Sequence, residues 1–538
     1  MVKKILYGTE AKNALKRGID TVADCVKITL GAKGRNVAID KQFDSPLITN
    51  DGVTIARDIE LADEFENMGA KLVCETSSTT NTVAGDGTTT AIVLAQALVN
   101  EGLKNITAGA NPVFIKKGMQ KAVYRVLEYI SENAHTISGT QDIARIATVS
   151  SRSSEFGDII AELMNKIGND GTISVEESQT GETTYEIVEG LSFNRGYVTP
   201  YMVTDGEKME AVLDKPYILI TNHQITNIHD ILPLLENVNK QGRALLIISD
   251  EINNDVLTTL VTNKLRGALK IVCVKAPAFG EKRDDLLEDI AIVTDGIFVN
   301  SKTGFELKNV DMSVLGEAKQ VKVGKEITTI IDGCGDPDVI KSRINQIKAQ
   351  LNTTTDSYDK EKLQDRLAKL SNGVGIIKVG ANTETEMKDK KLRLEDALSA
   401  TKSAVEEGIV AGGGVTLLNA KSVLESEFES LTGDEKIGVE IVARAIQYPI
   451  RRIVENAGLE GSVVINEIER SGKTNYGFDV YNEKYVDMFE SGIIDPAKVT
   501  KSALRNALSI AELVLTTEVL IADDKEEVAK LQMNNQVM

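Results

Sequence analysis

The sequence predicts a multidomain protein of α plus α/β class, with predominantly helical segments at both ends of the chain and an α/β region between them. Its 538 residues exceed what a single hydrophobic core usually contains. Apolar residues recur at helical spacing over most of the first 130 residues and again after about residue 336. In the middle, short apolar runs alternate with helical patterns, which is typical of buried strands in an α/β domain.

The N-terminal region is expected to begin with a helix from about residue 9 to residue 30, ended by Gly31. Its apolar residues are spaced by three or four positions: Leu15, Ile19, Val22, Val26 and Leu30. Two short strands, 37–39 and 47–49, follow. They are expected to form a hairpin with Asp51 at its tip.

The middle of the chain contains apolar runs at 244–248, 270–274 and 290–293, each of strand length. We expect these runs to be buried strands, because helical patterns separate them. A long charged helix is then expected from Glu384 to Glu407. Gly408 would end it.

The most informative segment is 84–90, which reads Ala-Gly-Asp-Gly-Thr-Thr-Thr and precedes an apolar helix pattern. Glycines allow the backbone to approach a ligand closely, and a helix N-terminus binds phosphate. Asp86 would repel a phosphate unless a cation such as Mg²⁺ lies between them. The pattern therefore indicates a Mg-nucleotide site. An ordinary loop, with threonines that cap the helix, fits the local pattern equally well.

Asp51 and Asp396 are further candidates for nucleotide chemistry, because hydrolysis needs a carboxylate that orients the attacking water. By pattern alone, Asp51 also fits a simple Asp-Gly turn, and Asp396 also fits a solvated helix position. Both would act with Asp86 only if the fold brings the three together.

Composition excludes several functions. The formal charge of −19 argues against a nucleic-acid partner, whose binders carry basic faces. No apolar run is long enough to span a membrane, and the first residues do not resemble a signal peptide. The four cysteines are scattered, which predicts reduced, mostly buried thiols and a cytoplasmic protein. With three histidines and no His-Glu-x-x-His, a zinc enzyme is not expected.

Two helical segments, about 228–238 and 256–265, carry more apolar positions than one buried stripe requires. The stretch 194–202 is a further candidate for the same surface. Apolar faces of this width indicate either a binding surface or a helix packed on two sides.

Together these motifs resemble the group I chaperonins of the bacterial GroEL type, essentially from end to end. The matching segments are 29–37, 84–90, 274–277, 395–397, 410–414 and 495–496. The resemblance implies an all-helical equatorial domain, a small intermediate domain and an inserted α/β apical domain. The corresponding residues are 1–132 with 408–538, 133–188 with 375–407, and 189–374. Gly190 and Gly373 would be the apical hinge.

The resemblance also implies the function. Two stacked seven-membered rings would capture unfolded or misfolded proteins and, with a small co-chaperonin lid, enclose them in a chamber for folding. ATP and Mg²⁺ would be the cofactors, and K⁺ is compatible with the family.

The site residues carry over position by position. Asp86 would bind Mg²⁺, and Asp51 and Asp396 would be catalytic, the last after its domain swings towards the nucleotide. The residues that would hold the nucleotide are Thr29, Leu30, Gly31, Ala32, Asn50, Asp86, Gly87, Thr88, Thr89, Thr90, Gly413, Asp479, Val480, Tyr481 and Asp495. The residues that would bind clients are Tyr197, Tyr201, Met202, Leu232, Leu235, Leu257, Val261 and Thr262.

Some positions depart from the family. Ala32 replaces a proline, and Asp479, Val480 and Tyr481 replace smaller or neutral residues expected beside the adenine. These departures keep a second hypothesis open, a divergent chaperonin with weakened ATPase that acts as a holding or adhesive surface. A small-molecule kinase or ligase is a remote third, because the sequence shows no polar substrate pocket.

Overall fold

The chain folds into two compact units in the computed structural model. Unit 1 comprises Met1–Glu162, Glu177–Thr183 and Val379–Met538, and unit 2 comprises Leu163–Glu176 and Thr184–Lys378. The structure describes residues 3–41, 46–137, 139–168, 171–178, 181–188, 190–206, 208–278, 280–303, 306–353, 356–371, 373–429 and 431–523. The three-domain division expected from the resemblance stays a prediction.

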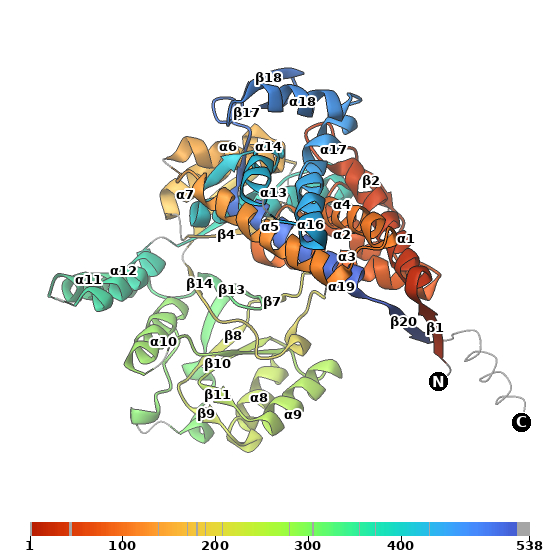
Figure 1. The fold of residues 1–538 in the computed structure, drawn as a ribbon. Coiled ribbons are helices and arrows are strands. Elements are labelled where there is room, and N and C mark those ends of the chain that lie inside the picture. The colour runs from red at the N-terminus through yellow and green to blue at the C-terminus, as the bar shows by residue number, and fades with distance from the viewer. Residues whose placement is uncertain are drawn as a thin grey trace, which may run out of the picture. The chain divides into compact units, whose positions relative to one another are not determined.

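Unit 1 is predominantly helical (Figure 1). Its helices are α1 (Gly8–Val26), α2 (Gly52–Asp58), α3 (Glu64–Ala84), α4 (Thr88–Thr107), α5 (Pro112–Glu132), α6 (Thr140–Ser151), α13 (Glu384–Glu407), α14 (Val415–Asn419), α15 (Lys421–Glu427), α16 (Gly433–Ala445), α17 (Tyr448–Asn456), α18 (Gly461–Ser471) and α19 (Ala497–Thr516). Its strand pairs are β1 (Lys3–Tyr7) with β20 (Val519–Asp523), β2 (Val37–Ile39) with β3 (Leu47–Thr49), β16 (Ile409–Ala411) with β19 (Ile494–Pro496), and β17 (Tyr476–Asp479) with β18 (Lys484–Asp487). Helix α7 (Ser154–Ile167) begins in unit 1 and ends in unit 2.

Helices α4 and α19 form the centre of unit 1 and pack against each other. Both are rich in Ala, Leu and Val, and they are buried around most of their circumference. Each keeps one narrow polar stripe, with Gln96, Asn100 and Lys104 on α4 and Lys498, Lys501 and Arg505 on α19. Glycines let neighbouring helices cross closely. A Cβ on Gly18 of α1 would lie 1.8 Å from the carbonyl oxygen of Glu66, and one on Gly69 of α3 would lie 2.1 Å from that of Leu15.

Unit 2 is built on a seven-stranded sheet of order β12-β10-β8-β13-β14-β6, with β7 paired to β13. Its strands are β6 (Gly190–Phe193), β7 (Ala211–Asp214), β8 (Tyr217–Ile220), β10 (Leu245–Ser249), β12 (Ile271–Lys275), β13 (Gly316–Val323) and β14 (Thr328–Gly333). Its helices are α8 (Leu232–Lys240), α9 (Asn254–Leu265), α10 (Glu281–Thr294), α11 (Pro337–Thr353) and α12 (Ser357–Ser371). A smaller sheet joins β4 (Thr172–Glu177), β15 (Val374–Val379) and β5 (Thr184–Val188), and β9 (Gln224–Ile225) pairs with β11 (Glu251–Ile252).

The α/β prediction for the middle of the chain is confirmed at β10 and β12, which run parallel to each other and to β8. Strands β8 and β10 are buried at every position, as expected for parallel strands covered on both faces. The predicted strand at 290–293 is wrong, because this run lies in helix α10. Ile290 is buried together with Leu287, at helical spacing. A short apolar run cannot distinguish a strand from a buried helix turn by itself.

Three further expectations need correction. The first helix ends at Val26, and a 3₁₀ turn, η1 (Lys27–Thr29), follows before Gly31 takes a φ of +87°. The predicted hairpin forms between β2 and β3, but Asp51 follows β3 and caps helix α2 instead of lying at the tip. Cysteines are less buried than expected, because Cys25 and Cys334 are exposed.

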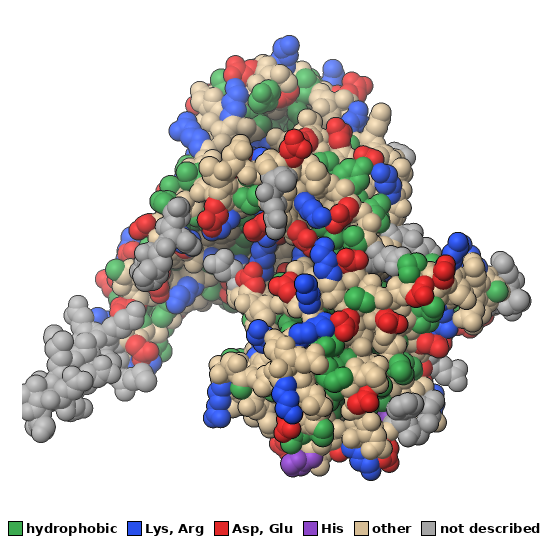
Figure 2. Space-filling view, turned by 180° about the vertical axis from the view of Figure 1, so that it is seen from behind, with side chains coloured by type: hydrophobic (Ala, Val, Ile, Leu, Met, Phe, Trp, Pro, Cys, Tyr) green, Lys and Arg blue, Asp and Glu red, His purple; other side chains and the backbone are tan. Residues whose placement is uncertain are grey.

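Helix α13 is confirmed from Glu384 to Glu407, and Gly408 ends it with a φ of +81°. Acidic and basic side chains are interspersed over the face shown in Figure 2. Among the helices that the structure describes, none has the length and apolar character needed to cross a membrane.

Candidate functional site

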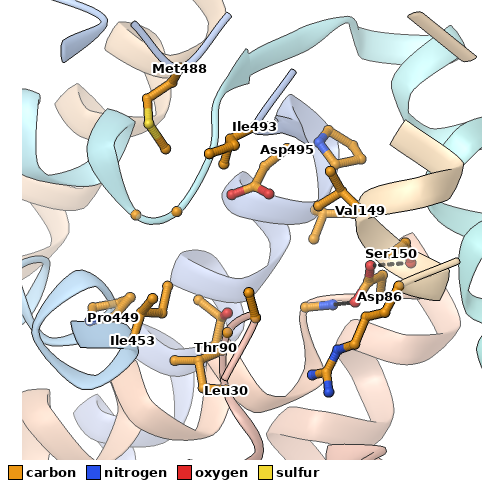
Figure 3. A pocket seen from close by; sticks show the side chains of 18 of the residues that line it. Leu30, Asp86, Thr90, Val149, Ser150, Pro449, Ile453, Met488, Ile493 and Asp495 are labelled. Atoms are coloured by element: carbon orange, nitrogen blue, oxygen red, sulfur yellow. Dashed lines mark hydrogen bonds between the residues drawn. The ribbon is translucent and has the colours of Figure 1, made fainter. Parts of the chain in front are cut away.

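A cavity of about 1050 Å³ lies in unit 1, where loops from distant parts of the chain meet. Its wall includes every residue predicted to hold the nucleotide or to act in hydrolysis. These residues are Thr29, Leu30, Gly31, Ala32, Asn50, Asp51, Asp86, Gly87, Thr88, Thr89, Thr90, Asp396, Gly413, Asp479, Val480, Tyr481 and Asp495. Figure 3 shows several of the lining side chains around the same space. The fold therefore joins segments that are hundreds of positions apart in the sequence.

The glycine loop connects helix α3 to helix α4 through two left-handed residues. Gly85 follows α3 with a φ of +70°, and Gly87 precedes α4 with a φ of +79°. A Cβ on Gly85 would lie 2.0 Å from the Cβ of Ser399, so the position has no room for a side chain. No side chain caps the N-terminus of α4, and the first residues of this long helix line the cavity. The cavity therefore receives the positive end of a helix dipole, which favours an anion.

Asp86 is held at the centre of this loop by two donors. The backbone N–H of Gly87 donates to its Oδ1 over 2.5 Å, and the Ser150 hydroxyl donates to its Oδ2 over 2.9 Å (Figure 3). Sequence reasoning missed Ser150. The residue lies in a serine-rich run at the end of α6, and nothing in that pattern connects it with position 86.

Asp51 is fixed by its role as the N-cap of α2. Its Oδ1 accepts from the N–H of Val53 over 3.3 Å, and its Oδ2 accepts from the N–H of Thr54 over 3.0 Å. Asp396 lies on α13, which is anchored near the glycine loop because the Ser403 hydroxyl donates to the carbonyl of Ala84 over 2.9 Å. In this structure Asp396 already lines the cavity with Asp51.

The carboxyl groups of the cavity wall raise one another's pKa values. Burial raises the pKa of Asp86, and the charge of Asp51 raises it further. Burial and the charges of Asp51 and Asp86 raise the pKa of Asp396 well above its usual range. The pKa of Asp495 is raised to about 7 by burial and by the charge of Asp86. Ionisation of all these carboxyl groups together is therefore unfavourable, and a bound cation would favour their ionised forms.

The donor set fits Mg²⁺ bound together with a phosphate. Carboxylate oxygens are ligands that Mg²⁺ accepts, and it usually takes only one or two of them from the protein. Within the part of the chain that the structure describes, no group of three or more His, Cys, Asp or Glu side chains could hold a metal ion by itself. A cation at Asp86 would therefore need oxygens from a ligand or from water.

The opposite side of the cavity is apolar. Pro449 and Ile453 lie across from Asp86 and Ser150, and Met488 and Ile493 cover a further part of the wall (Figure 3). Sequence reasoning missed these apolar residues. The arrangement suits a ligand with one apolar ring and one anionic end.

The turn between β17 and β18 supplies the divergent residues. The carboxylate of Asp479 accepts from the N–H groups of Tyr481 and Asn482, over 2.9 and 3.1 Å, so it stabilises its own turn. Val480 is buried, and Tyr481 is exposed.

The predicted client residues, in unit 2, fall into three groups by exposure. Tyr201 is 65% exposed and Leu232 is 38% exposed. Tyr197, Leu257, Val261 and Thr262 are partly buried. Met202 and Leu235 are 0% and 4% exposed and belong to the hydrophobic core. These two need correction, because side chains inside the core are not available to a partner.

The two predicted hinge glycines lie inside unit 2. A Cβ on Gly190 would lie 2.8 Å from the Cγ2 of Val374, and one on Gly373 would lie 2.5 Å from the carbonyl oxygen of Val188. Gly373 has a φ of +65°. Both positions exclude a side chain, and their role as a hinge stays a prediction.

Comparisons with known proteins identify the family. The chaperonin gp146 from the bacteriophage EL 2 (Pseudomonas aeruginosa), crystallised in the presence of ATP-BeFx, has a similar fold, with a TM-score of 0.67 and 22% sequence identity. The match covers 97% of this chain and 99% of that chain. The model of the TCP-1/cpn60 chaperonin family matches residues 22–525. The chain therefore belongs to the TCP-1/cpn60 chaperonin family.

Proposed function

We propose that this chaperonin is an ATP-dependent folding machine, which binds and hydrolyses Mg-ATP in the cavity of unit 1 and captures unfolded or misfolded proteins on unit 2. The observation that carries the proposal is the convergence, in one cavity, of the uncapped N-terminus of α4, the carboxylate of Asp86 and an apolar opposite wall. A nucleotide has the matching parts, an anionic phosphate chain and an aromatic base.

The chain's own residues would position the nucleotide. The base would lie against Pro449 and Ile453, and the phosphates would approach the first turn of α4 and Asp86. Mg²⁺ held at Asp86 would neutralise phosphate charge. Asp495 would hydrogen-bond the nucleotide from the wall.

Hydrolysis needs a water molecule that is oriented and then loses a proton. Asp51 is held in one orientation by its cap hydrogen bonds, so it suits the orienting role. Asp396 has a raised pKa, which makes its carboxylate a stronger proton acceptor than an ordinary aspartate. We assign the proton-accepting role to Asp396 on this basis.

Client capture would use the α8–α9 surface, which we define as Tyr197, Tyr201, Leu232, Leu257, Val261 and Thr262. The Tyr201 segment is fastened to α9, because the Nζ of Lys264 donates to the carbonyls of Tyr201 and Val203 over 3.2 and 2.7 Å. Exposed apolar side chains on a fixed surface suit unfolded proteins, which also expose apolar groups. We extend the proposal to the two seven-membered rings, the co-chaperonin lid and a cytoplasmic location, in each case by family resemblance.

A second candidate function is a holding or adhesive surface with weakened ATP use. The observation that favours it is the β17–β18 turn, where Asp479 and the exposed Tyr481 line the cavity. The carboxylate of Asp479 adds negative charge to a cavity that is proposed to bind an anionic phosphate chain. Phosphate release by the purified protein, with and without Mg²⁺, separates the two candidates.

Asp396→Ala tests the first candidate directly. The variant should bind ATP with about the parent affinity and release phosphate about 100-fold more slowly or worse, because it lacks the proton acceptor. Glu406→Ala is the matched control, since Glu406 lies on the same helix and pairs with Lys498 outside the cavity wall. Parent-like turnover by Asp396→Ala would remove its assigned role, and no turnover by the parent would favour the second candidate.

A further inference from the structure

The cationic side chains of the cavity wall are all arginines, and they differ in whether a carboxylate lies within ion-pair distance. Among the described residues that line the cavity, they are three arginines, Arg145, Arg152 and Arg393, and no lysine. Arg393 pairs with Asp389 over 2.8 Å, and Arg145 lies 3.9 Å from Asp142. Arg152 has no carboxylate within ion-pair distance among the residues that the structure describes, although acidic side chains are abundant in the same wall.

The backbone places Arg152 between the end of α6 and the start of α7. It follows the last residue of α6 with a φ of +57°, a left-handed conformation that is uncommon for a residue with a side chain. Its Nη2 donates to the carbonyl of Thr29 over 3.1 Å, so the side chain reaches the η1 turn. This single hydrogen bond fixes one edge of the guanidinium.

The remaining donors of Arg152 are available to a ligand. A guanidinium has five N–H donors in a planar fork, which matches the oxygens of a phosphate. Burial and the charge of Arg393 lower the pKa of Arg152, and the charges of Asp86 and Asp389 partly offset this effect. An anionic ligand in the cavity would stabilise the cation further.

The position of Arg152 in the cavity indicates which end of the ligand it would contact. Ser150, two residues earlier, donates to Asp86, and both lie across the cavity from Pro449 and Ile453 (Figure 3). The base would occupy the apolar side. The guanidinium of Arg152 lies at the Thr29 carbonyl, and the Thr29 hydroxyl lies 3.4 Å from the hydroxyl of Thr89 in the first turn of α4. Arg152 therefore lies beside the helix turn that would receive the phosphates.

We propose that Arg152 binds the terminal phosphate of the nucleotide and so makes the site prefer a nucleoside triphosphate to a diphosphate. The inference rests on the proposed nucleotide function and adds a specificity-determining residue to it. Arg152 joins α6 to α7, and its side chain reaches the η1 turn. A bound triphosphate would therefore also hold this junction against η1.

The test compares Arg152→Asn and Arg152→Lys with the parent, by calorimetric binding of ATP, ADP and AMP in the presence of Mg²⁺. Asparagine tolerates the left-handed backbone, so the turn is kept while the charge is lost. Arg152→Asn should weaken ATP binding about 10- to 100-fold, weaken ADP binding clearly less and leave AMP binding unchanged. Arg152→Lys should keep part of the preference. Arg470→Gln, on the exposed end of α18, is the control and should bind all three as the parent does.

Each result decides the assignment. Parent-like ATP affinity in Arg152→Asn overturns it, although the proposed function stands. An equal loss for ATP, ADP and AMP also overturns it, because that pattern describes a structural residue. A parent protein that binds no nucleotide overturns both the assignment and the proposed function.

Discussion

The cavity of unit 1 and the α8–α9 surface of unit 2 are built on opposite principles. The cavity gathers charged and glycine residues from loops far apart in the sequence, and its wall includes Asp51, Asp86, Asp396 and Asp495. The α8–α9 surface uses apolar side chains that lie over the core of its own unit. Recognition of a charged small molecule needs such convergence, whereas capture of apolar chains needs only an exposed patch.

The difference extends to tolerance of change. In unit 1, Gly85 has no room for a Cβ, so the loop geometry depends on one backbone position. On the α8–α9 surface, Tyr201 and Leu232 are exposed and can change without disturbing the core. We therefore expect a substitution on the α8–α9 surface to affect client binding alone. A substitution of a buried residue that joins several helices should affect the stability of its whole unit.

The largest expected effect concerns the stability of unit 2. Asp289 is fully buried on α10 and accepts from the Nε of Arg343 over 2.7 Å and from the Nε of Arg366 over 2.8 Å. These bonds tie α11 and α12 to α10. Asp289→Ala should lower the free energy of unfolding by about 3–5 kcal/mol, because it leaves two guanidinium groups without their buried partner. Denaturant unfolding followed by circular dichroism measures this loss.

Asp285→Ala is the control for that experiment. Asp285 pairs with the Nη1 of Arg366 over 2.8 Å, but its side chain is 52% exposed, so its removal should cost less than about 1 kcal/mol. Nucleotide binding should persist in Asp289→Ala, because the cavity lies in unit 1. Similar losses of stability in the two variants would contradict the role of Asp289 in joining α10, α11 and α12.

A smaller effect is expected from the client surface. The double variant Tyr201→Ser with Leu232→Ser should bind a permanently unfolded protein, such as reduced and alkylated lactalbumin, about 10-fold more weakly, because it removes exposed apolar area. Its phosphate release should match the parent. Fluorescence anisotropy of the labelled client measures the affinity.

Leu235→Met provides the matched control on the same helix. Leu235 is buried, and a swap of similar volume should change neither client affinity nor turnover. If Leu235→Met weakened client binding as much as the double variant does, the exposed side chains would not be the binding determinants.

The sequence predicts some parts of this molecule well for physical reasons. Helix α13 is long and ends at a glycine, and β10 and β12 are apolar at their first four positions, so local pattern determines each of them. The run 290–293 is too short for its pattern to decide between strand and helix.

Local sequence pattern also predicts only part of the cavity in unit 1. Local pattern indicates the glycine loop around Asp86, but the meeting of Asp51, Asp86 and Asp396 in one cavity depends on how distant helices pack. Ser150 and Arg152 lie in an unremarkable polar run, so their contacts with Asp86 and Thr29 appear only in the folded chain. Burial of Met202 and Leu235 is likewise a property of tertiary packing.

The most direct test of the central claim is calorimetric titration of the parent and of Asp86→Ala with ATP, with Mg²⁺ and with a chelator. We expect Mg²⁺ to strengthen ATP binding by the parent at least about 10-fold, because the ion lies between the carboxylate and the phosphates. Asp86→Ala should lose this dependence on Mg²⁺. Parent binding that is equally tight in chelator, or that is absent altogether, would contradict the account.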